Sequence, residues 1–285
     1  MLPDLALPAG MGKCLCPEGS AGLTGPALVL SAIYLRCFFM HKQLLYLLFI
    51  TFSLCGFAQQ NDSRIPTGAL ITYAAEGGRT VGDGDGNNSP LTTALLEHLG
   101  DPDDIAVVLR KVSEKVYKNT NGRQQPVGYT SLAGGALVLS AIKSNSGKAI
   151  NAHALIIGNS AYANSFKLRN PTNDARAISE KLKGLSFKVT EALDADRGAL
   201  TTVLSQFYKT SANADLTLLF YAGHGVQVSG TNYMLPVDMK ANDLGEKDIQ
   251  VQGISFDSVA ENLPGKTKLI FLDANRDNPF TFKVR

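Results

Sequence analysis

The chain has 285 residues, enough for one large domain or two small ones, and 45% of them are hydrophobic. Its 27 basic and 25 acidic side chains leave a net charge of +2, with no basic block of the kind that binds phosphates. We therefore expect no nucleic-acid partner. All four cysteines lie early in the chain, so the rest contains no disulfide, thiolate metal site or cysteine nucleophile: Cys14, Cys16, Cys37 and Cys55.

Residues 1–60 are predicted to be a leader. A short positive start, Met40–Lys42, precedes an apolar run, Leu44–Leu54, and Gly56–Ala58 supplies the small residues of a cleavage site. This order is typical of a secretory signal peptide with a natural start near Met40. A second apolar run, Pro26–Ile33, leaves a membrane anchor as the alternative. We expect an exported protein, periplasmic or extracellular, or one attached to a membrane only through this segment.

Residues 66–141 carry a first set of predicted elements. Ala69–Ala75 is apolar and β-branched, as in a strand. Ser89–Leu99 begins with a hydroxyl cap and a proline, a good helix start, and then shows apolar residues at helical spacing. Asp103–Tyr117 is a second amphipathic helix, and Gly134–Ile142 is expected to be another strand.

Residues 142–151 are a linker candidate, and residues 152–285 carry a second set of elements. Strands alternate with helices here, which predicts an α/β fold with a mainly parallel sheet covered by helices. The expected order is strand His153–Gly158, helix Asn173–Lys183, strand Phe187–Ala192, helix Gly198–Thr210, strand Leu216–Tyr221, helix Phe256–Leu263 and strand Lys268–Asp273.

Polar residues follow two of these strands at the point where each ends. The strand that ends at Tyr221 continues into Gly223, His224 and Gly225, whose glycines allow a turn that presents the imidazole. The strand that ends at Asp273 continues into an equally polar segment. Open α/β sheets bind their ligands at the carboxyl ends of their strands, so both strand ends are candidates for one site.

Five motifs in this region resemble the caspase-like cysteine peptidases of clan CD (peptidase family C14), most closely the bacterial metacaspases or orthocaspases. They are His153–Asn159 with Tyr162, Leu168–Ala175, Phe220–Gly225, Tyr233–Asp238, and Leu272–Ala274 with Arg276–Phe280. The resemblance implies a three-layer caspase-like fold with helices on both faces of the central sheet. It also implies peptide-bond hydrolysis by a Cys-His dyad.

The resemblance assigns roles to five residues. His224 matches the catalytic histidine, and Asn275 stands at the position of the nucleophilic cysteine. The backbone N–H groups of Gly225 and of residue 275 would form the oxyanion hole. Asp174 and Asp273 match the acidic residues of the metacaspase S1 pocket, which implies a peptide or protein substrate with Arg or Lys at P1. For Asp174, a helix-start acid stabilised by the helix dipole is the structural alternative.

Residues from about 67 to 140 resemble the family's small-subunit half, which normally follows the nucleophile motif and here precedes it. Either the domain is circularly permuted, or the chain joins the end of one copy to the start of another. A seven-residue identity between Ala27–Ile33 and Ala136–Ile142 favours a duplication in the history of the chain. We expect the two halves to complete a single sheet and the protein to be a monomer.

We expect no cofactor and no metal site, although the resemblance to metacaspases leaves calcium dependence open. The segment after Asp83 fails as an EF-hand loop, because Asn88 and Ala94 stand where that loop needs Gly and Glu. Acidic residues elsewhere are available, but their spacing alone indicates no site: Asp238, Asp243, Glu246 and Asp248.

Asn275 decides what the chain can catalyse. An amide neither ionises nor loses a proton to an imidazole near neutral pH, so acyl transfer through this side chain is not expected. The sequence therefore predicts a peptidase domain that is catalytically dead as written, whether by nature or through an inactivating change. The alternative function is a non-catalytic pseudoprotease that binds peptides or regulates a partner.

Overall fold

The computed structural model describes residues 65–75, 82, 84, 86–142, 150–163, 166–239 and 245–274. The predicted leader lies outside these residues, as do Asn275 and most of the predicted linker. Within the described part of the chain, none of the helices is both long and apolar enough to cross a membrane.

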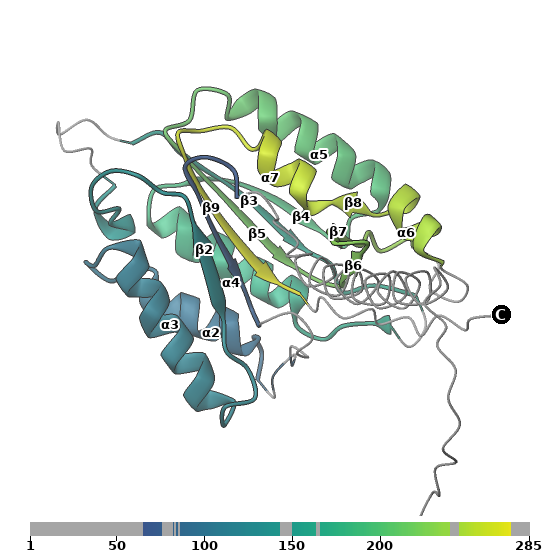
Figure 1. Ribbon diagram of the computed structural model, residues 1–285, viewed down its shortest axis with the longest axis horizontal. Coiled ribbons are helices and arrows are strands. Elements are labelled where there is room, and N and C mark those ends of the chain that lie inside the picture. The colour runs from purple at the N-terminus through teal and green to yellow at the C-terminus, as the bar shows by residue number, and fades with distance from the viewer. Residues whose placement is uncertain are drawn as a thin grey trace, which may run out of the picture. The chain divides into compact units, whose positions relative to one another are not determined.

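A six-stranded sheet forms the centre of the fold (Figure 1). Its five neighbouring pairs are all parallel except the pair at one edge, β2 with β1. β3 and β5, which lie next to each other inside the sheet, are buried along their whole length, as expected of strands covered on both faces. In spatial order the strands are β2 (Val127–Thr130), β1 (Ala69–Tyr73), β9 (Thr267–Asp273), β5 (Leu216–Ala222), β3 (Ala152–Gly158) and β4 (Lys188–Leu193).

Both predicted sets of elements contribute strands to this one sheet. β1 lies parallel to β9, with Thr72 opposite Phe271. β9 in turn lies parallel to β5, with Asp273 opposite Ala222. Segments almost 200 residues apart in the chain are therefore hydrogen-bonded neighbours. The domain boundaries and the evolutionary permutation stay predictions.

Helices cover both faces of the sheet and complete three layers (Figure 1). Successive strand residues point to opposite faces, so Ile156 packs with the first group of helices and Ile157 with the second. The first group is α2 (Pro90–His98), α3 (Ile105–Asn119) and α4 (Pro171–Gly184), and the second is α5 (Arg197–Thr210) and α7 (Phe256–Asn262). The α/β caspase-like architecture predicted from the sequence is confirmed.

Helix starts follow the local sequence closely. Ser89 caps α2 by accepting a hydrogen bond from Thr92 N at 2.9 Å, and Pro90 occupies the first helical position. Asp196 caps α5 in the same way. Because each cap satisfies backbone N–H groups that no helical carbonyl can reach, these residues fix where the helices begin.

A hairpin extends from the end of β5 and was not predicted from the sequence. β6 (Gly225–Val228) pairs antiparallel with β7 (Thr231–Met234), and the short β8 (Ile254–Ser255) completes a three-stranded sheet. Helix α6 (Glu246–Gln252) follows in the chain and packs on the hairpin. The hairpin begins immediately after His224, so it determines how that residue leaves the central sheet.

The expected strand at Gly134–Ile142 is wrong. This segment contains only a 3₁₀ turn, Leu139–Ala141, and its apolar side chains pack on the first group of helices. Its backbone bonds to the start of α3 instead of to a strand: Leu137 N donates to Asp104 Oδ2 at 2.7 Å, and Leu137 O accepts from Ile105 N. The antiparallel edge strand is β2, whose mostly exposed side chains give no apolar signal.

Candidate active site

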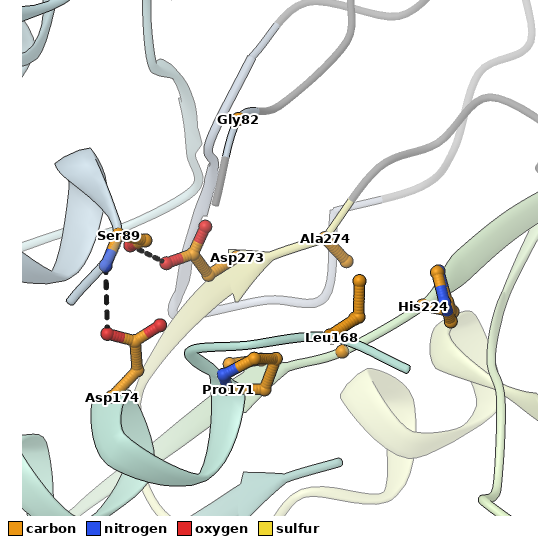
Figure 2. Close-up of a pocket in the computed structure, with 10 residues that line it drawn as sticks. Gly82, Ser89, Leu168, Pro171, Asp174, His224, Asp273 and Ala274 are labelled. Atoms are coloured by element: carbon orange, nitrogen blue, oxygen red, sulfur yellow. Dashed lines mark hydrogen bonds between the residues drawn. The ribbon is translucent and has the colours of Figure 1, made fainter. Parts of the chain in front are cut away.

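A cavity of about 220 Å³ lies at the carboxyl ends of β5 and β9. The polar strand ends predicted from the sequence meet here, because Ala222 and Asp273 are partners in adjacent parallel strands. Both halves of the chain line the cavity: Gly82, Ser89, Leu168, Pro171, Asp174, Ala222, Gly223, His224, Asp273 and Ala274. Figure 2 shows Asp174 and Asp273 together near Ser89, with His224 on the opposite side of the pocket.

The start of α2 holds both carboxylates. Ser89 donates from its backbone N–H to Asp174 Oδ1 at 3.0 Å and from its hydroxyl to Asp273 Oδ2 (Figure 2). Asn88 Nδ2 also donates to Asp174 Oδ1, at 2.8 Å, and Thr92 Oγ1 donates to Asp273 Oδ2 at 3.2 Å. Two acids carried by α4 and β9 are thus fixed by donors from the other half of the chain.

Helix dipoles add to these hydrogen bonds. Asp174 lies in the first turn of α4, and the N-cap of α2 contacts it directly. The amino ends of two helices therefore converge on the acidic side of the pocket, and each favours a negative charge there. Asp174 is 2% exposed and Asp273 is 7% exposed, so water screens this field weakly. Asp174 therefore lies both in the first turn of a helix and in the wall of the cavity, and its role in an S1 pocket stays a prediction.

The His224 ring is held in one orientation. Its Nε2 lies 2.7 Å from the carbonyl oxygen of Phe166, which can only accept a hydrogen bond, so Nε2 carries the hydrogen. In the neutral ring Nδ1 is then the basic nitrogen. The ring of Tyr162 packs against the imidazole with 4.5 Å between centroids, and Phe166 approaches edge-on at 6.4 Å.

Gly225 lies buried at the first position of β6, directly after His224. Leu235 N donates to His224 O at 3.1 Å, so the next pair along the ladder, Gly225 with Met234, is a non-hydrogen-bonded pair. The N–H of Gly225 therefore points away from β7. This direction is compatible with the role predicted for the N–H, which is to donate to the oxyanion.

Several residues that shape the pocket were missed or only partly understood from the sequence. Ser89 was predicted as a helix cap, and its contacts with both acids were not foreseen. Leu168 and Pro171 form part of the wall, and the Phe166 carbonyl orients the imidazole. Leu168 and Pro171 belong to a motif quoted for the family resemblance, which was the available signal.

A metal site is not evident in the described part of the chain, where no three His, Cys, Asp or Glu side chains are grouped as ligands would be. Asp238 Oδ1 accepts a hydrogen bond from Arg197 N at 3.1 Å, and Asp248 Oδ2 accepts one from Gly245 N at 2.9 Å. Asp243 lies outside the described residues. The expectation of no metal site, with calcium dependence left open by the resemblance, stays a prediction.

A family model for the caspase domain, peptidase family C14, matches residues 50–134 and 151–283. The chain belongs to the caspase-domain family. The two matched stretches cover most of the sequence and include both sets of strands that form the central sheet. The resemblance found in the motifs is thereby confirmed at the level of the family.

Two curated relatives share part of this caspase domain. They are the mucosa-associated lymphoid tissue lymphoma translocation protein 1 of Homo sapiens and its homolog in Mus musculus. Each is 34% identical to the chain over 101 residues, which are 35% of this chain and 12% of the relative. The aligned region is thus a small part of those proteins.

Proposed function

We propose that this caspase domain binds peptides through an Arg or Lys side chain held by Asp174 and Asp273, and that the chain as written does not cleave them. One observation carries the proposal: two buried carboxylates from different elements line the same cavity as His224. A guanidinium or ammonium group between two carboxylates gains charge-assisted hydrogen bonds in a site of low exposure.

The same arrangement supports a hydrolytic mechanism for a variant with a thiol at position 275. His224 Nδ1 would take the thiol proton, and the thiolate would attack the peptide carbonyl carbon. The Gly225 N–H would stabilise the resulting oxyanion. Collapse of this intermediate would expel the amine, which takes its proton from the imidazolium, and water would then hydrolyse the thioester. Asn275 supplies no such nucleophile, which is why we propose binding without turnover.

Binding is tested on the parent protein with two fluorescent peptides that differ only in arginine or citrulline at one position. Citrulline keeps the shape of arginine and removes its charge. We expect the arginine peptide to bind at least about tenfold more tightly, since a hydrogen-bonded charge is worth roughly 1.5–3 kcal/mol. Asp174→Asn should remove most of this preference. Asp196→Asn, which removes a carboxylate from the start of another helix but keeps its cap, should not.

Turnover is tested with Asn275→Cys on Arg, Lys and Asp substrates, each with calcium and with a chelator. We expect cleavage after Arg or Lys only, and loss of that cleavage when His224→Ala is added. A well-folded Asn275→Cys protein that cleaves nothing would show that the dyad is wrongly assigned. Cleavage by the parent protein that His224→Ala abolishes would refute the proposal that the parent binds without turnover.

A further inference from the structure

Two buried tyrosine hydroxyls form hydrogen bonds with the turn that carries His224. Tyr162 comes from the segment after β3, and Tyr221 comes from the end of β5. His224 N donates to Tyr162 Oη at 3.0 Å, and Tyr221 Oη donates to His224 O at 2.6 Å. The backbone of His224 is thus bound on both its N–H and its C=O side by buried hydroxyl groups.

The Tyr162 hydroxyl stands where a strand-to-strand hydrogen bond would be expected. His224 and Leu235 face each other at the start of the β6–β7 ladder, and Leu235 N donates to His224 O at 3.1 Å. The reciprocal bond is replaced by a bridge. Tyr162 Oη accepts from His224 N and donates to Leu235 O, each at 3.0 Å. The hydroxyl therefore lies between His224 N and Leu235 O, where an ordinary ladder would have a direct hydrogen bond.

The remaining contacts of Leu235 O show how the bridge is supported. Asn159 Nδ2 donates to this oxygen at 3.0 Å, and Asn159 Oδ1 accepts from Ala195 N at 3.0 Å. Tyr221 Oη also lies 3.3 Å from Leu235 O. Three side chains from two of the family-like motifs thus meet at a carbonyl of a third motif, and the proposed mechanism gives none of the three side chains a chemical step.

Space at this point allows no side chain on the residue before His224. A Cβ at Gly223, whose φ is +155°, would lie 2.8 Å from both tyrosine hydroxyl oxygens. The hydroxyls and the turn are therefore in close contact, and a small shift of one moves the other.

The two hydroxyls stay neutral at any working pH. Burial raises the pKa of Tyr162 to about 12 and that of Tyr221 well above 10. The bridge consequently does not titrate where an imidazole does, and it can hold the turn in both protonation states of His224.

We propose that Tyr162 is a positioning residue: its hydroxyl is a spacer that holds the His224–Leu235 pair open and thereby sets the imidazole against the Phe166 carbonyl. Without the hydroxyl, the His224 N–H and the Leu235 C=O would lose their shared partner and close the ladder bond directly. That closure would draw His224 towards β7. The proposal rests on the proposed function only where it concerns turnover.

The structural part is tested on the parent protein by NMR, with Tyr162→Phe, which keeps the ring that packs on the imidazole. We expect a direct hydrogen-bond coupling between His224 N and the Leu235 carbonyl carbon in the variant and none in the parent. The ring nitrogen shifts should show the Nε2–H tautomer of neutral His224 in the parent and a mixture of tautomers in the variant. Unchanged couplings and tautomer would overturn the proposal.

Two matched substitutions separate positioning from general loss of stability. Tyr221→Phe removes a hydroxyl that donates to His224 O, accepts from Leu235 N and lies 3.3 Å from the Tyr162 hydroxyl. It leaves the Tyr162 bridge and the Leu235 N to His224 O bond in place, so the tautomer should be retained. Tyr208→Phe removes a half-buried hydroxyl from α5. This helix and α4 cover opposite faces of the central sheet. If both variants change the His224 ring shifts as much as Tyr162→Phe does, the specific role of Tyr162 is refuted.

The catalytic consequence is tested in the Asn275→Cys background. Adding Tyr162→Phe should lower kcat by about ten- to a hundredfold, as small misplacements of a catalytic group do, with KM changed by less than about twofold. A fall in binding without a fall in kcat would contradict a positioning role. If Asn275→Cys proves inactive, the proposed turnover fails while the NMR result still decides the role of Tyr162.

Should Tyr162→Phe fail to fold, tyrosine fluorinated at ring position 3 can replace Tyr162 and retain every heavy atom of the bridge. The fluorinated hydroxyl is a weaker acceptor and a stronger donor. The His224 amide proton resonance should then shift measurably, and the Leu235 carbonyl should shift in step. Absence of both shifts would show that the hydroxyl does not bridge the pair.

Discussion

Ser89→Ala should destabilise the protein more than the loss of a helix cap explains. The substitution removes the hydroxyl that accepts from Thr92 N and donates to Asp273 Oδ2. A lost cap costs about 1 kcal/mol, and a lost hydrogen bond to a buried charged group costs about 1.5–3 kcal/mol. The backbone N–H to Asp174 and the Thr92 hydroxyl remain, so the expected loss of unfolding free energy is about 2.5–4 kcal/mol.

Ser255→Ala is the matched control. Ser255 caps α7 by accepting from Ser258 N at 3.2 Å, and within the described part of the chain its hydroxyl bonds to no carboxylate. We expect this variant to lose only about 1 kcal/mol. Urea unfolding at constant pH measures both, and the midpoint of Ser89→Ala should lie lower than that of Ser255→Ala by roughly 1 M.

Combining Ser89→Ala with Asp273→Ala tests the contact itself. The two single losses should not add, because each removes the same hydrogen bond, and the coupling free energy should reach about 1–3 kcal/mol. Additive losses, or equal effects of Ser89→Ala and Ser255→Ala, would refute the reasoning that Ser89 fixes the acidic side of the pocket.

Two further predictions concern the steric space at a glycine of the site and the titration of a buried histidine. Gly223→Ala should lower the unfolding free energy by about 1–3 kcal/mol, because its Cβ would press on two hydroxyl oxygens at 2.8 Å. Gly184→Ala, where no atom lies within 4 Å of the added Cβ, should be neutral or stabilising by up to about 1 kcal/mol in the same denaturation assay. His153→Gln should reduce the loss of stability on acidification. Burial, with a contribution from Lys188, lowers the pKa of His153 below 6.5, so the unfolded chain takes up the proton first. As the pH falls from about 7 to about 5, the unfolding free energy of the variant should decrease less than that of the parent. Parallel curves would contradict the lowered pKa of His153.

The sequence predicted those parts of the fold that have strong local signals. The apolar runs of β5 and β9 and the capped starts of α2 and α5 were located to within one or two residues. The hairpin after His224 and the edge strand β2 were missed. Their residues alternate weakly and lie partly exposed, so their conformation depends on partners that the local sequence does not name.

The apolar segment Gly134–Ile142 shows the opposite error. Its composition favours a strand, but among the described residues the six-stranded sheet ends at β2 and does not include this segment. Leu137 instead satisfies its backbone at Asp104 and at the start of α3. Apolar composition predicted the conformation wrongly and the burial only in part, since Leu139 is the one fully buried residue among those described in this segment. An apolar side chain does not specify which groups its backbone bonds to.

For the site, the sequence could name the chemistry-bearing residues but not their supports. His224, Asp174 and Asp273 were chosen from motifs, and all three line one cavity. Ser89 and Tyr162 were noticed as a helix cap and a motif residue, but their contacts with the site were not predicted, because these are single hydrogen bonds across large sequence separations. Ser89 reaches Asp273 over 184 positions, and Tyr162 reaches His224 over 62. No local pattern encodes such a contact.

These supports also bear on the predicted permutation, because they show which contacts join the two halves of the chain. The acidic side of the pocket needs the start of α2, and α2 reaches it because β1 lies beside β9 in the central sheet. The histidine side is held by Tyr162, the Phe166 carbonyl, Tyr221 and the hairpin, all of which come from residues after 151. The two sides of the pocket therefore depend on different parts of the chain. Loosening β1 from β9 should weaken the acidic side first and leave the imidazole in place, whichever half is synthesised first.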